Sequence, residues 1–187
     1  MGWRGAALLP STIFARYNSP MLFSIAPPLT ASQSRALLLF CLSSGARRFT
    51  VGFLYSHGDD SEKCFMKFRE RLAPFSAGRQ VLENCGGGRF QEMECWELNT
   101  RSLDVILAEA DDDLFASFQY GPEDWIFYVD DSILLQIVTH EQEATLRLNG
   151  EQYSAFEALG VSHGKGCPKW SGLPETPIRR DTETITG

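Results

Sequence analysis

The C-terminal half of the chain contains four apolar runs of strand length, separated by residues that favour turns. The runs are LFASFQY (114–120), DWIFYV (124–129), SILLQIVTH (132–140) and EATLRL (143–148). A Gly-Pro pair and an Asp-Asp pair separate the first three runs. Consecutive strands joined by tight turns pair antiparallel. The pattern therefore predicts a four-stranded antiparallel meander over residues 114–148.

Helical patterns precede and follow this meander. Apolar residues recur at helical spacing in four segments that begin at capping residues, namely Thr30 or Ser32 to Ser44, Asp60 or Ser61 to Phe75, Thr100 or Ser102 to Ala110, and Asn149 to Gly160. Two further strands are predicted at 48–56 and 90–98, where β-branched and aromatic residues are frequent. We expect an α+β fold, in which three to four helices cover a mainly antiparallel sheet.

The length of 187 residues and the 43% hydrophobic content suit one well-filled core. We expect a single domain over residues 21–170, and a flexible tail at 171–187. Residues 1–20 lack a periodic apolar face, so this segment is either a flexible leader or lies ahead of a true start at Met21. The apolar run 36–42 is far shorter than the roughly 20 residues needed to cross a bilayer.

The five cysteines are odd in number, widely spaced and never arranged as C-x-x-C. This spacing argues against a disulfide framework and against a structural zinc site, and it favours a reducing compartment. We therefore expect a cytoplasmic protein that is a monomer or weak dimer, with no cofactor and no bound metal. Export to the periplasm stays open, because the opening segment is basic and partly apolar.

Charge is unevenly distributed along the chain. Residues 1–90 hold eleven Lys/Arg against five Asp/Glu, whereas residues 91–151 hold two against fifteen. No Lys or Arg stands between Arg101 and Arg147, and the whole chain carries a net charge of −7. An acidic surface repels nucleic acid and anionic membranes, so we expect neither as a partner.

The acids of the middle segment alternate with aromatic residues and fall at predicted turns. Exposed carboxylates beside aromatic anchors suit fast, tight binding to a basic protein. The candidate partner-binding residues are Asp111, Asp112, Asp113, Tyr120, Glu123, Asp124, Trp125, Asp130 and Asp131. The same carboxylates also have a simpler interpretation, as ordinary ionised acids that keep turns solvated and sheet edges apart.

Catalytic and metal-binding motifs are not recognisable in the sequence. The run DDDLFASFQYGPE lacks the oxygen ligands of a calcium-binding EF-hand loop, and neither G-x-S-x-G nor H-E-x-x-H occurs. An alternative function is a small hydrolase or transferase whose site is assembled in space from His57, Asp59, Cys95 and His140. A second alternative is an adaptor or chaperone that uses the acidic surface on a secreted effector.

Residues 90–160 combine the aromatic and acidic meander EDWIFYVDDSILLQIVTHEQEATLRL with the capped helix NGEQYSAFEALG. In this respect the chain resembles the immunity proteins of bacterial polymorphic-toxin and type VI secretion systems. The resemblance implies a non-enzymatic protein that binds and neutralises one cognate toxin, often a nuclease with a basic cleft.

Overall fold

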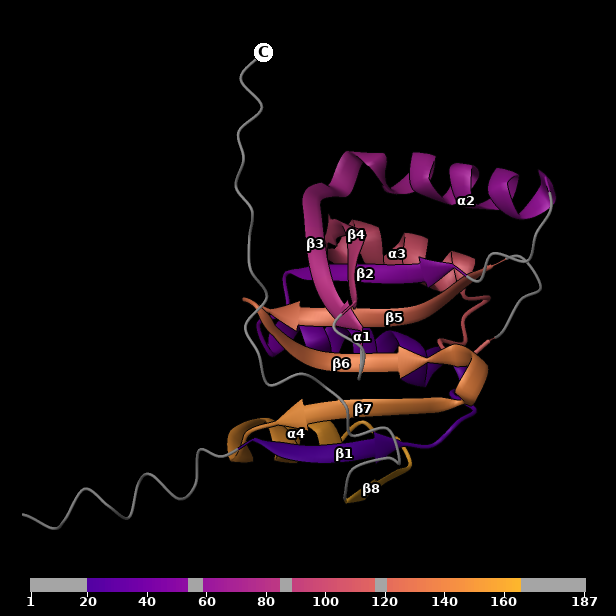
Figure 1. Ribbon diagram of the computed structural model, residues 1–187. Helices are drawn as coiled ribbons and strands as arrows, with labels where there is room; N and C mark the ends of the chain where they lie inside the picture. Colours follow the sequence, from indigo (N-terminus) through magenta and orange to yellow (C-terminus); the bar gives the residue numbers. More distant parts are fainter. Residues whose placement is uncertain (1–19, 54–58, 85–88, 117–120, 166–187) are drawn as a thin grey trace, which may run out of the picture.

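The computed structural model describes residues 20–53, 59–84, 89–116 and 121–165 (Figure 1). The strands are β1 (Met21–Ile25), β2 (Arg48–Phe53), β3 (Ser76–Asn84), β4 (Arg89–Glu97), β5 (Pro122–Val129), β6 (Ser132–Val138), β7 (Glu143–Leu148) and β8 (His163–Lys165). The helices are α1 (Ala31–Ser43), α2 (Asp59–Leu72), α3 (Thr100–Glu109) and α4 (Gly150–Glu157), and the short 3-10 helices are η2 (Ala73–Phe75) and η3 (Thr139–Glu141).

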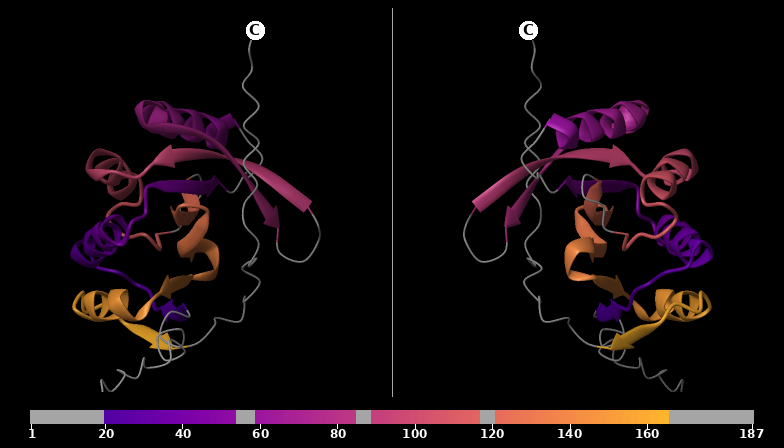
Figure 2. Two further views of the ribbon diagram at one scale, coloured as in Figure 1. Left: turned by 90° about the vertical axis from the view of Figure 1, so that its left-hand side faces the viewer. Right: turned by 90° about the vertical axis from the view of Figure 1, so that its right-hand side faces the viewer.

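All eight strands form one antiparallel sheet in the order β3-β4-β2-β5-β6-β7-β1-β8. Strands β5, β6 and β7, at the centre of the sheet, correspond to the last three of the four predicted strands of the meander. Figure 2 shows α1, α3 and α4 along one face of the sheet, while the β3–β4 hairpin extends past the other face. Phe68 of α2 packs on Trp96 and Trp125, so α2 covers the same face as the other helices.

The core lies between the helices and this face of the sheet. One row of fully buried side chains crosses five neighbouring strands in register: Phe49, Phe127, Leu135, Leu146 and Phe23. Because side chains alternate along a strand, the sequence neighbours of these residues on each strand point to the face without helices. Thr50 and Tyr128 belong to that second face, where their hydroxyl oxygens lie 3.1 Å apart and both residues are buried.

The predicted fold class, α+β with a mainly antiparallel sheet and four helices, is confirmed. Capping boxes at Thr30 and Asn149 begin α1 and α4 at predicted positions. Helix α3 starts as predicted at Thr100, although its cap is Asn99. No helix among the described residues is long and apolar enough to cross a membrane.

Some of the predicted boundaries are wrong. The first run of the meander is not a strand over 114–116, where the chain turns and buries the adjacent side chains of Leu114 and Phe115. Two neighbouring buried residues break the alternation that a half-buried strand requires. Strands β1, β3 and β8 were not predicted. Residues 1–19 of the predicted leader, residues 117–120 of the first run and the predicted tail at 171–187 lie outside the described residues.

Candidate functional site

A β-bulge near the start of β5 brings two carboxylates together. Gly52 of β2 pairs with Glu123, while the preceding Val51 pairs with Trp125, so Asp124 is an extra residue in β5. Asp124 has the left-handed backbone angle φ of 54°. In a regular strand the side chains of Glu123 and Asp124 would point to opposite faces. The extra residue shifts this alternation, and both carboxylates turn toward η3.

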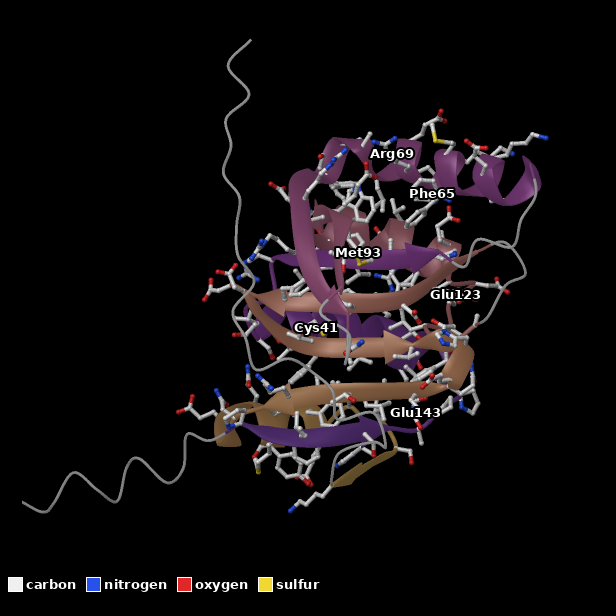
Figure 3. All side chains as sticks on the ribbon, in the orientation of Figure 1. Cys41, Phe65, Arg69, Met93, Glu123 and Glu143 are labelled. Atoms are coloured by element: carbon white, nitrogen blue, oxygen red, sulfur yellow. The ribbon has the colours of Figure 1, made fainter. Side chains whose placement is uncertain are left out.

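The imidazole of His140, in η3, faces these two carboxylates. Its Nδ1 atom lies 3.3 Å from Asp124 Oδ1 and 3.7 Å from Glu123 Oε2. Its other nitrogen, Nε2, lies 3.8 Å from Glu141 Oε1. Glu123 is buried, with 3% of its side chain exposed, whereas 43% of the His140 side chain is exposed. Glu123, Asp124 and His140, which we call the bulge cluster, therefore run from the interior to the surface (Figure 3, where Glu123 is labelled).

Hydrogen bonds from η3 hold the bulge in place. The backbone N–H of Asp124 donates to the Thr139 hydroxyl oxygen, and the backbone N–H of Thr139 donates to Asp124 Oδ1, both at 3.2 Å. The side-chain amide of Gln142 then donates to the carbonyl oxygens of Thr139 and Phe115. These contacts join the end of β6, the start of β5 and the loop after α3, so that His140 is positioned by backbone contacts on both sides.

Burial raises the pKa of the Asp124 carboxyl above its usual 3.8, because removing a carboxylate from water disfavours its charged form. The nearby His140 and the hydrogen bond from Thr139 act in the opposite direction, since both favour the carboxylate. The expectation that every acid of the middle segment is an ordinary turn carboxylate is wrong for Asp124, which lies in a strand bulge and is partly desolvated.

Asp111, Asp112 and Asp113 follow the C-terminal end of α3, and here the prediction of turn acids is confirmed. Asp111 and Asp112 are exposed, with left-handed φ angles of 47° and 61°. The backbone N–H of Asp112 donates to the carbonyl of Leu107, which closes the helix. The partial negative charge at the C-terminal end of a helix disfavours nearby anions. Three carboxylates at this position therefore do not stabilise α3.

Asp130 and Asp131 form the turn between β5 and β6, at the opposite end of β5 from the bulge cluster (Figure 1). Arg48 donates from its guanidinium to the Asp130 carbonyl and forms an ion pair with Asp131 at 2.9 Å. The candidate acids Glu123 and Asp124 thus lie at one end of β5 and Asp130 and Asp131 at the other, so the predicted set is not one cluster.

Two of the predicted surface residues are in the interior. Trp125 is 1% exposed and belongs to the core, and Glu123 is 3% exposed. Trp125 points toward the helices because it stands two residues before Phe127 on the same side of β5. It cannot serve as an exposed anchor for a partner. Tyr120 lies outside the described residues.

The uneven charge along the sequence is partly balanced in the fold. Arginines of the basic N-terminal half form ion pairs with acids of the middle segment, namely Arg35 with Asp104, Arg48 with Asp131, Arg69 with Glu94, and Arg71 with Glu109. The fold places these basic and acidic segments, which are distant in the sequence, side by side. The acids of the α3 loop and of the bulge cluster are not part of these four pairs.

The alternative catalytic set is not brought together in the described part of the chain. Cys95 of β4 is buried and lies near Tyr128, whereas His140 lies beside Asp124. Tyr128 and Asp124 are four residues apart on β5, a separation of about 13 Å. His57 lies outside the described residues, and so does the side chain of Asp59.

The bulge cluster was missed because its members come from two segments whose approach depends on a one-residue register shift. The only sequence signal is an Asp, a residue type that tolerates left-handed backbone angles, beside a strand. No protein-family model, curated protein or solved structure was found to match this chain.

Proposed function

We propose that this protein is a non-enzymatic binding protein whose acidic surface at the η3 end of the sheet binds a basic protein. The surface consists of Asp111, Asp112 and Asp113 in the loop after α3 and of Asp124 and Glu141 around η3, two segments that the Gln142 hydrogen bond to the Phe115 carbonyl joins. We call it the η3-end surface. It replaces the larger set predicted from the sequence, since Trp125 and Glu123 are buried and Asp130 and Asp131 lie at the other end of β5.

The observation that carries the proposal is the position of Asp111, Asp112 and Asp113. Asp111 and Asp112 are exposed, Asp113 is half-buried and accepts a hydrogen bond from the Phe115 N–H, and all three follow the C-terminal end of α3, where a cation would be favoured over an anion. Their mutual repulsion and the helix dipole both reduce stability in the free protein. A cationic partner would remove both costs on binding, which makes these acids better suited to recognition than to folding.

The resemblance to toxin-immunity proteins suggests which basic protein this is. We propose a cognate toxin, such as a nuclease effector, whose basic cleft the η3-end surface covers. The free thiols of Cys41, Cys64 and Cys95 support a cytoplasmic location, where cysteines stay reduced. An adaptor for a secreted effector would use the same surface, and it differs in leaving the partner active.

The test compares two variants that each remove three negative charges. Asp111→Asn, Asp112→Asn and Asp113→Asn change the η3-end surface, and Asn tolerates the left-handed backbone angles there. The matched control combines Asp130→Asn, Glu151→Gln and Glu157→Gln, all exposed residues away from this surface. Tagged full-length chains are expressed in the source cells, and proteins bound to each are quantified by mass spectrometry.

A basic protein should be recovered with the wild type and with the control, and be depleted with the triple Asn variant. Its association rate, measured at low and high salt, should fall about tenfold in that variant and depend less on salt. Equal recovery of all proteins with both variants would rule out the η3-end surface as the binding site. Inhibition of the recovered protein's activity would favour the immunity function over the adaptor.

A further inference from the structure

We propose that the bulge cluster is a binding site for a divalent first-row transition metal ion of the zinc class. Its ligand atoms are Glu123 Oε2, Asp124 Oδ1 and His140 Nδ1, and atoms of these three side chains that can bind a metal all lie within 4.8 Å of one another. The inference does not depend on the proposed basic partner, because it rests on geometry within this chain.

The separations of the ligand atoms match one shared ion. Ligands about 2.0–2.2 Å from a tetrahedral zinc ion are about 3.3–3.6 Å from each other. His140 Nδ1 lies 3.3 Å from the Asp124 oxygen and 3.7 Å from the Glu123 oxygen, so small side-chain rotations are enough to close the site.

The charges around His140 also favour a divalent ion. Even a protonated imidazole brings one positive charge to face three carboxylates, those of Glu123, Asp124 and Glu141. A divalent ion would balance the two ligand carboxylates while the imidazole binds in its neutral form.

A second observation comes from the groups behind the ligands. In protein metal sites the nitrogen of a ligating histidine that does not bind the metal commonly donates to a carboxylate, and ligating carboxylates are themselves hydrogen-bonded. Here His140 Nε2 faces Glu141 Oε1 at 3.8 Å, and the Thr139 N–H donates to Asp124 Oδ1 at 3.2 Å. The Thr139 hydrogen bond thus fixes the Asp124 ligand, while the Glu141 carboxylate lies on the outer side of the His140 ring.

The donor set selects the class of metal. One imidazole and two carboxylates suit Zn²⁺, Mn²⁺ or Fe²⁺, whereas Ca²⁺ prefers six or more oxygen ligands. Three protein ligands leave at least one coordination position open, and 43% of the His140 side chain is exposed. Water or a group from another molecule would occupy the open position. The sequence, which lacks closely spaced ligand pairs, predicted no metal site, and the folded geometry argues for one.

The experiment titrates Zn²⁺ into the full-length chain, freed of metal with a chelator that is then removed, and follows binding by calorimetry. The chain carries Cys64→Ser, because Cys64 is an exposed thiol that can bind zinc on its own. We expect one saturable site per chain. Affinity should fall at least tenfold in His140→Gln and in Asp124→Asn, and several-fold in Glu141→Gln. Asp130→Asn, the matched acid at the other end of β5, should bind as before.

Nitrogen NMR of the histidine side chains provides a readout that does not depend on any ligand variant. Zinc should shift the Nδ1 resonance of His140 and leave the ring of His163, which packs among Phe23 and Phe156, unchanged. Absence of saturable binding, or equal affinity in His140→Gln with no shift at His140, would overturn the proposal.

Discussion

The two ends of strand β5 carry the same sequence feature, a pair of adjacent acids, in opposite environments. At its start, Glu123 and Asp124 lie in a bulge, one buried and one partly desolvated, and both face His140. At its end, Asp130 and Asp131 lie in a turn, and Arg48 bonds to both, through the Asp130 carbonyl and the Asp131 carboxylate.

The difference between these ends comes from the backbone rather than from the residue types. At the turn the chain reverses, Asp130 is exposed, and the half-buried Asp131 pairs with an arginine from the neighbouring strand. At the bulge one extra residue places two carboxylates on the same side of the sheet, against a residue from η3. The Asp131 carboxylate at the turn therefore has an arginine as its partner, whereas the Asp124 carboxylate at the bulge faces a histidine. The bulge acids are held by the register shift in β5 and by their contacts with η3, and variants at and beside the bulge test this arrangement.

The two ends of β5 should differ most in how much stability is lost when a neighbouring apolar side chain is truncated. Trp125 follows the bulge, is 1% exposed and meets Phe68 at 6.1 Å between ring centroids. Trp125→Ala should lower the free energy of unfolding by about 3–5 kcal/mol, because it leaves a large cavity in the core. Val129→Ala, at the half-buried other end, should cost about 1 kcal/mol. Urea denaturation measures both, and similar values for the two variants would contradict the packing described here.

The bulge itself is tested at Gly52. A Cβ atom at this position would lie 3.3 Å from both the Asp124 Cβ and the Glu123 carbonyl oxygen, so strand β5 would have to give by a few tenths of an ångström. Gly52→Ala should therefore reduce stability by about 1–2 kcal/mol. Gly150→Ala is the matched control, since no atom lies within 4 Å of its added Cβ and alanine suits the first turn of α4. If Gly52→Ala were as stable as Gly150→Ala, strands β2 and β5 would not approach each other at the bulge as closely as these distances state.

Local sequence signals were sufficient for much of the fold. The helices α1, α3 and α4 begin where Thr30, Thr100 and Asn149 predict, because a capping residue and an apolar stripe act within a few residues. Strands β2, β5, β6 and β7 also follow their apolar patterns. Strand β8 spans three residues, and β3 contains a glycine with φ of 97°, so neither has a readable alternation.

The candidate sites depended on information that local patterns do not contain. The turn acids after α3 were predicted, because left-handed Asp residues occur at such turns. The pairing of Arg48 with Asp131, and the meeting of Asp124 with His140, depend on which strands are neighbours and on one shift in register. Trp125 was misplaced for a related reason: a strand with large apolar residues on both faces does not reveal which ones are covered by helices.

The smallest expected effect is the pH dependence of stability that Asp124 confers. Burial raises its pKa in the folded protein above 3.8, so the folded state holds this proton more tightly than the unfolded state. Its contribution to stability is complete below pH 3.8 and is lost as pH rises through the higher folded value. Asp124→Asn has no such proton. With chelator present, the stability of this variant relative to wild type should therefore rise with pH across that window, by a modest amount because the side chain is 37% exposed.

His140→Gln removes the charge that lowers the Asp124 pKa, so the loss of stability in that variant should extend to higher pH. Urea denaturation from pH 3 to 6 measures all three chains, and a difference between Asp124→Asn and wild type that stays constant with pH would mean that the bulge leaves this carboxyl as solvated as the acids of the turn.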